Sequence, residues 1–143
     1  MAKLELSREL PLPPDEAWAH ASDLAHLGDW LVMHQGWRGE VPAELTRGVT
    51  LVGVAGAKGL RNRVTWTVRE VEPPRLLDLT GDGVGGTKYA LRMTVEPTAS
   101  GSSFAFKLEL GGRPLFGPIG AAAARAVKGD IERSIERFQT LYS

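Results

Sequence analysis

The last quarter of the chain constrains the fold most, because it carries one long amphipathic helical pattern. In this sequence of 143 residues the pattern runs from Phe116 to Tyr142. At ~100° per residue, its inward stripe consists of Ile119, Ala123, Val127, Ile131, Ser134, Ile135, Phe138 and Leu141. Alanines gather at the start of this helix and bulkier residues follow. We therefore expect a long C-terminal helix whose first half leaves space against the surface that it covers.

Most of the preceding chain alternates apolar and polar residues with the period of two that is typical of β-strands. The expected strands are a first one around Leu4 to Leu10, a weak one at Arg38–Val41, then Val49–Ala55, Arg61–Val71, Leu76–Thr80, Thr87–Val95 and Ser103–Leu110. One face of the resulting sheet is apolar, and the other carries Arg63, Arg92 and Lys107. We expect the C-terminal helix to cover the apolar face.

Two short helices are expected after the first strand. One follows Pro13 and Pro14, with Asp15 and Glu16 in a first turn that favours negative charge. The other spans about Leu24–Leu31, with Asp23 as its cap. The predicted fold class is therefore α+β: a curved antiparallel sheet of about seven strands around a long C-terminal helix, as one domain over residues 1–143.

Composition excludes several classes of function. Lysine plus arginine equals aspartate plus glutamate, 17 against 17, so no net field would attract a nucleic acid. No cysteine is present, which excludes disulfides and thiolate chemistry. No apolar run reaches the roughly 18 residues that a membrane span requires. We expect a cytoplasmic protein with no nucleic-acid partner and no integral membrane contact.

Two motifs match known binding patterns only in their spacing, and we interpret both without a ligand. Gly81, Gly83 and Gly86 match the spacing of a dinucleotide-binding loop, but a strand pattern follows them where a helix would be needed. We interpret them as hairpin glycines that permit positive φ. Asp23, His26 and Asp29 recur every three residues and would not converge on one metal ion. We expect no metal site and no cofactor.

The order of elements and several short strings resemble the START-like (SRPBCC) superfamily, which has the helix-grip fold and includes the polyketide cyclase/dehydrase group. The strings are Leu12-Pro13-Pro14-Asp15-Glu16-Ala17-Trp18, Ala21-Ser22-Asp23-Leu24 and Gly28-Asp29-Trp30. Gly81-Asp82-Gly83-Val84-Gly85-Gly86, Leu115-Phe116-Gly117-Pro118-Ile119-Gly120 and Lys128-Gly129-Asp130-Ile131 further resemble an actinobacterial branch, with one mycobacterial member described as the toxin of a type II toxin–antitoxin pair. The resemblance implies a mostly apolar cavity under the long helix, and no fixed catalytic set.

The candidate ligand-binding residues combine aromatic groups with the start of the helical stripe. They are Trp30, His34, Trp37, Trp66, Tyr89, Met93, Phe106, Ala123, Val127, Asp130, Ile131 and Ser134. His34 either lines the cavity mouth or lies on the surface. Asp130 either faces the cavity as a general acid/base or pairs with Arg133 or Arg137.

Three functions follow, in order of expectation. The first is binding of a small hydrophobic molecule, lipid-, polyketide- or quinone-like, in the cavity. The second, carried only by the resemblance, is a toxin-like growth regulator that acts by binding and has an antitoxin-like protein partner. The third is an aromatase/cyclase-type enzyme using Asp130, His34 and Tyr89, for which the sequence offers no evident catalytic dyad.

Overall fold

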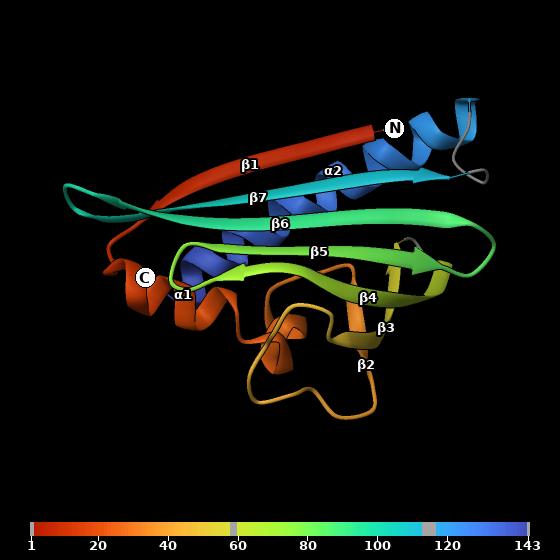
Figure 1. Cartoon of the computed structure of the whole chain (residues 1–143). Helices are drawn as coiled ribbons and strands as arrows, with labels where there is room; N and C mark the ends of the chain where they lie inside the picture. Colours follow the sequence, from red (N-terminus) through yellow and green to blue (C-terminus); the bar gives the residue numbers. More distant parts are fainter. Residues whose placement is uncertain (1, 58–59, 113–116, 143) are drawn as a thin grey trace.

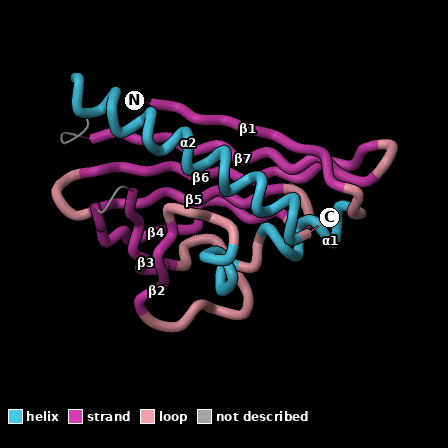
Figure 2. Tube along the Cα trace, turned by 180° about the vertical axis from the view of Figure 1, so that it is seen from behind, coloured by secondary structure: helices cyan, strands magenta, loops and turns pink. Residues whose placement is uncertain are grey.

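A long helix crosses one face of a curled antiparallel sheet in the computed structural model of the chain (Figures 1 and 2). The structure describes residues 2–57, 60–112 and 117–142; the side chains of residues 2, 57, 60, 117–121, 123 and 124 lie outside this description. The helix, α2 (Gly117–Leu141), lies behind the sheet in Figure 1 and in front of it in Figure 2. We refer to the face that it covers as the inner face.

The chain order is one strand, two short helices, six strands and α2. The first strand is β1 (Ala2–Leu10), followed by α1 (Pro14–Ala21) and the 3-10 helix η1 (Leu24–Asp29). The remaining strands are β2 (His34–Arg38), β3 (Thr50–Ala57), β4 (Leu60–Glu72), β5 (Leu76–Gly83), β6 (Thr87–Thr98) and β7 (Gly101–Gly112). The α+β helix-grip fold predicted from the sequence is confirmed.

Every neighbouring strand pair in the sheet is antiparallel, and the spatial order is β1-β7-β6-β5-β4-β3-β2. Hairpins connect β3 through β7 in sequence, whereas β1 pairs with β7 at the far edge. Alternation gives each strand one apolar face that must be buried. The inner face is accordingly buried over its middle, where Val68, Leu79, Met93 and Phe106 are each at most 1% exposed.

Two local expectations are wrong. The weak strand expected at Arg38–Val41 lies earlier, at His34–Arg38, because Gly39 has a φ of 102° that ends the extended run. Asp23 does not cap the second short helix; its carboxylate instead accepts a hydrogen bond from His26 Nδ1 at 2.7 Å. That segment forms a 3-10 helix that is kinked at His26.

Candidate functional site

The C-terminal half of α2 is packed closely against the inner face. Trp30, fully buried after η1, contacts Phe104, Phe106 and Phe138 edge-on, with ring centroids 5.9, 5.9 and 5.0 Å away. The rings of Phe104 and Phe138 stack at 4.4 Å. Ile131 is 1% exposed. Aromatic groups of the protein thus fill this half of the interface, and Trp30, Phe106 and Ile131 from the candidate set lie in it.

Ser134 and Asp130 have structural partners in this half. Ser134 Oγ accepts a hydrogen bond from the backbone N–H of Val32 at 2.9 Å and donates one to the carbonyl of Asp130 at 2.7 Å. These bonds join α2 to the chain that follows η1. The Asp130 carboxylate forms an ion pair with Arg133, one turn along the helix. Of the two alternatives for Asp130, the structure therefore has the arginine pair.

His34 and Trp37 lie in β2, which is the edge strand opposite β1. His34 is 8% exposed, and its Nε2 is buried without a hydrogen-bond partner in the part of the chain that the structure describes. Its ring lies 4.4 Å from that of Trp37, whose Nε1 donates to the carbonyl of Leu24 at 2.6 Å. Burial lowers the pKa of the imidazole from 6.5 to about 4, so His34 is neutral at pH 7.

A cluster of three polar side chains lies on the inner face at the end of the sheet where β2, β4 and β6 begin. The Asn62 amide nitrogen, from β4, donates to Thr87 Oγ1 at 2.7 Å and to the Tyr89 hydroxyl at 3.0 Å, both from β6. The Asn62 amide oxygen accepts from the backbone N–H of Val84 at 3.0 Å. The ring of Trp66 lies 5.8 Å from that of Tyr89.

Strand register brings these groups together. His34 pairs with Ala55, and Ala55 pairs with Asn62, so the three form a row across β2, β3 and β4. Since neighbouring strands lie about 4.8 Å apart, the Cα atoms of His34 and Asn62 are separated by roughly 10 Å. We call His34, Trp37, Asn62, Trp66, Thr87 and Tyr89 the polar end of the inner face. None of the six is an aspartate, glutamate, lysine or arginine, and His34 is neutral at pH 7.

Two glycines of one strand make room for these side chains. A Cβ added at Gly83 would lie 1.9 Å from Thr87 Oγ1, and one at Gly81 would lie 2.7 Å from Val64 Cγ1 and 2.9 Å from Trp66 Cε3. Both glycines belong to β5, so their interpretation as turn residues is wrong. Positive φ in this hairpin occurs at Gly85 (85°) and at Gly86 (90°), so the turn interpretation is confirmed for Gly86 alone of the three glycines.

The candidate ligand-binding residues predicted from the sequence did not include Asn62 and Thr87, although the alternation pattern could have identified Asn62. Asn62, Val64 and Trp66 are two residues apart, so strict alternation places the amide on the inner face with the two apolar groups. Three candidates lie in or beside the packed middle: Met93, which is 1% exposed, Val127, which is 7% exposed, and Asp130. The side chain of Ala123 lies outside the described part.

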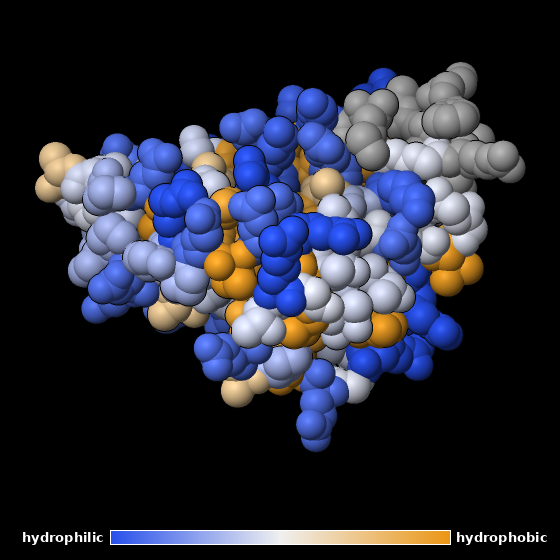
Figure 3. All heavy atoms as spheres, in the orientation of Figure 1, coloured by the Kyte–Doolittle hydropathy of each residue, from blue (hydrophilic) through white to orange (hydrophobic). Residues whose placement is uncertain are grey.

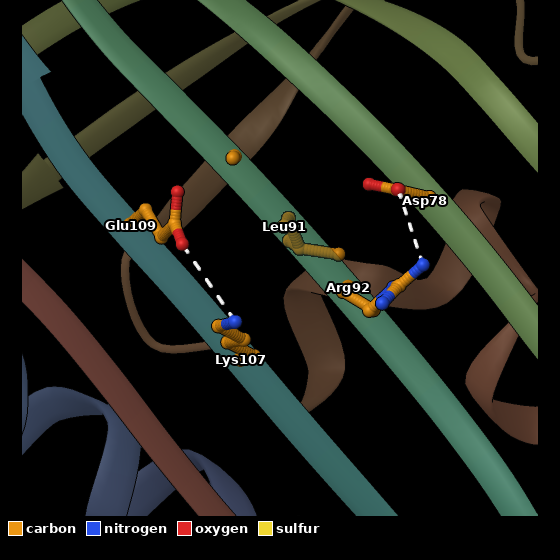
Figure 4. A pocket seen from close by; sticks show the side chains of 6 residues that line it. Asp78, Leu91, Arg92, Lys107 and Glu109 are labelled. Atoms are coloured by element: carbon orange, nitrogen blue, oxygen red, sulfur yellow. Dashed lines mark ion pairs between the residues drawn. The ribbon is translucent and has the colours of Figure 1, made fainter.

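The outer face carries paired charges. Figure 3 shows it as largely hydrophilic. A hollow of about 220 Å³ on this face is lined by Ala90, Asp78, Arg92, Lys107 and Glu109, and Figure 4 shows the four charged side chains around it. Arg92 pairs with Asp78 and Lys107 with Glu109, each at 3.7 Å. Burial raises the pKa of the Asp78 carboxyl above its usual value, and Arg92 opposes this shift. These pairs fit a solvated sheet face.

Two further hollows are lined by described residues, and neither lies between α2 and the sheet. One of about 440 Å³ lies beside Asp29 and the outer side of α2, from Arg133 to Leu141; another of about 150 Å³ lies between residues 22–25 and 41–45. Over the described ranges, no three His, Asp or Glu side chains are grouped to hold a metal ion. Among the described helices none has the length and apolarity of a membrane span.

The helix-grip fold defines the class of this protein, whose inner face has a polar and aromatic end. The chain belongs to the family described as polyketide cyclase/dehydrase and lipid transport, which matches residues 1–142. It is 56% identical over 142 residues to an uncharacterized protein of Mycobacterium tuberculosis, with 99% of each chain covered. It is 43% identical to a Mycobacterium tuberculosis protein named as a toxin, over all of this chain and 99% of the other.

Solved structures support the same fold. A protein of Thermus thermophilus superposes with a TM-score of 0.76 at 19% identity, covering 97% of this chain and 95% of its own. DynU16, a protein of the dynemicin biosynthetic locus, superposes with a TM-score of 0.69 at 19% identity, covering 96% of this chain and 46% of its own. The family match and the toxin-named relative confirm the superfamily resemblance, including the branch with a toxin-named member.

Proposed function

We propose that the protein binds a small hydrophobic molecule, lipid-, polyketide- or quinone-like, against the polar end of the inner face. The observation that carries this proposal is the contrast between the two ends of that face. The end under the C-terminal half of α2 is filled by Trp30, Phe104 and Phe138. The other end presents Trp66 and the hydroxyl of a half-buried Tyr89. Ligand sites characteristically combine apolar walls with a few placed polar groups.

The family description, which names lipid transport and polyketide cyclase/dehydrase activity, supports the same proposal. Ala55 provides a direct test because it is 7% exposed and lies in the row between His34 and Asn62. Ala55→Leu would place a larger apolar group within the polar end. Ala90→Leu is the matched control, since Ala90 lines the hollow on the outer face.

Binding is measured as the fluorescence gain of N-phenyl-1-naphthylamine, an uncharged apolar dye, with circular dichroism to verify folding. We expect the wild type and Ala90→Leu to bind the dye equally, and a folded Ala55→Leu to bind it at least 5-fold more weakly, as a loss of about 1 kcal/mol would produce. Unchanged binding by Ala55→Leu would place the ligand elsewhere. Absence of binding by the wild type would contradict the function itself.

The toxin-named relative favours a second candidate function. At 43% identity over the whole chain, we propose that the protein also restrains growth by binding a cellular component, with an antitoxin-like protein as its partner. Inducible expression in a mycobacterial host tests this proposal. Slowed growth that is relieved by co-expression of a small neighbouring gene is the expected result; growth at the uninduced rate contradicts it.

A cyclase-type reaction is compatible with the family and would use the same polar end. Its candidate groups there are the neutral imidazole of His34 and the hydroxyl of Tyr89. Asp130 is less suited because Arg133 already holds its carboxylate. Turnover of an aromatic polyketide that is lost in both His34→Gln and Tyr89→Phe would support this reaction, and binding without turnover would contradict it.

A further inference from the structure

The orientation of the Asn62 amide is fixed by a backbone group. The N–H of Val84 can only donate, and it lies 3.0 Å from the Asn62 side-chain oxygen. The same N–H also lies 3.2 Å from the carbonyl oxygen of Arg63, so two acceptors share it. The contact still favours the amide oxygen on the Val84 side, which leaves the amide nitrogen facing Thr87 and Tyr89.

Both hydroxyl groups consequently act as acceptors toward Asn62. An amide N–H₂ has two protons, and Asn62 gives one to Thr87 Oγ1 and one to the hydroxyl oxygen of Tyr89. Each hydroxyl keeps its own proton to donate. Among the described residues neither proton has an acceptor, although Thr87 is only 8% exposed. A buried hydroxyl proton without an acceptor is costly, so an occupant that accepts the proton of Thr87 would bind favourably, and the half-buried Tyr89 hydroxyl can donate to the same occupant.

The two hydroxyl oxygens are placed to share one acceptor. The N–H bonds of a planar amide diverge by about 120°, which puts the oxygens roughly 5 Å apart at hydrogen-bonding distances from the nitrogen. An oxygen atom at about 2.8 Å from both would fit between them. Gly83 is required for this arrangement, since Thr87 Oγ1 occupies the space that a Cβ would fill.

We propose that Thr87 and Tyr89, held by Asn62, form a two-donor site for a carbonyl oxygen of an uncharged ligand. This site rests on the proposed function, because it lies at the polar end where that ligand would bind. It narrows the ligand to molecules that carry a ketone or quinone oxygen on an apolar frame. The ring of Trp66, 5.8 Å from that of Tyr89, would provide an adjacent apolar wall.

A carboxylate is disfavoured by the charges around the site. Arg61 and Arg63 lie on the exposed outer face, and Arg61 Nε donates to Gln35 at 2.8 Å. His34 is neutral at pH 7 because burial lowers its pKa to about 4. Thus no described residue of the polar end supplies a positive charge. An anionic headgroup would lose its hydration there without a counter-ion, whereas a carbonyl oxygen requires only hydrogen-bond donors.

Three bicyclic probes of similar size test the site: 2-methyl-1,4-naphthoquinone, 2-methylnaphthalene and 2-naphthoate. The absence of cysteine from the chain precludes thiol addition to the quinone. Dissociation constants are measured by calorimetry for the wild type, Tyr89→Phe and Thr87→Val. Thr94→Val, on the outer side of the same strand, is the matched control. Thermal unfolding of each variant verifies that it is folded.

Of the three probes, we expect the wild type to bind the quinone most tightly. Each hydroxyl deletion should weaken quinone binding roughly 2- to 10-fold and leave 2-methylnaphthalene binding unchanged, as expected for one hydrogen bond. The infrared stretch of the bound quinone carbonyl should shift to lower frequency in the wild type, and less in both variants. Thr94→Val should match the wild type in its dissociation constants and in the infrared shift.

Equal weakening for quinone and hydrocarbon would overturn the two-donor site and leave the hydrophobic-ligand function intact. Tighter binding of 2-naphthoate than of the quinone would overturn the preference for an uncharged ligand. Failure of the wild type to bind any of the three probes would overturn both the site and the proposed function.

Discussion

Burial of His34 predicts that the protein loses stability in mild acid. The imidazole titrates near 6.5 when exposed and at about 4 in the folded protein, where burial disfavours its charged form. Between these values the unfolded chain binds the proton more readily, so lowering the pH favours unfolding. The stabilisation is fully present above pH 6.5 and is lost as the pH falls toward 4. The loss is at most about 1.4 kcal/mol per pH unit, or roughly 3 kcal/mol over the window.

Urea denaturation followed by tryptophan fluorescence, repeated between about pH 7.5 and pH 4.5, measures this dependence. His34→Gln removes the titrating group, so the wild type should lose more stability than this variant across the window. His26→Gln is the matched control, because His26 is an exposed histidine of η1 that pairs with Asp23. A constant difference between wild type and His34→Gln at every pH would refute the reasoning.

Three substitutions test the packing by their urea midpoints. Gly83→Ala should lower the free energy of unfolding by about 2–4 kcal/mol, because its Cβ would lie 1.9 Å from Thr87 Oγ1; a midpoint like that of the wild type contradicts this. Gly129→Ala should raise the free energy of unfolding by about 0.5–1 kcal/mol, since an alanine in α2 would meet only the end of a flexible arginine at 3.6 Å. A lower free energy of unfolding would mean that the added methyl group does not fit there. Ser134→Ala should cost about 1–3 kcal/mol because the N–H of Val32 loses its partner, and a neutral result would mean that water replaces the hydroxyl.

The fold was predictable because its signals are local. The alternation of Val64, Trp66 and Val68 requires a strand with one buried face, and the matching alternation from Tyr89 to Val95 supplies another strand of the same sheet, two positions away across β5. The stripe at Val127, Ile131 and Ile135 requires a helix on that face. Boundaries were less accurate, as at β2, which ends before Gly39 with a φ of 102° but continues through Gly36 with a φ of 138°, a difference that the sequence does not reveal.

The sequence by itself determined which side chains face inward, because the periods of two and of 3.6 residues are properties of the backbone. Only the tertiary structure decided which of these side chains meet. Asn62 contacts Thr87 and Tyr89 across the β5 strand through register, and Gly83 leaves the space that the Thr87 hydroxyl and the Asn62 amide need. Hydrogen bonds between residues more than twenty positions apart depend on strand order and on a missing Cβ, which no local pattern encodes.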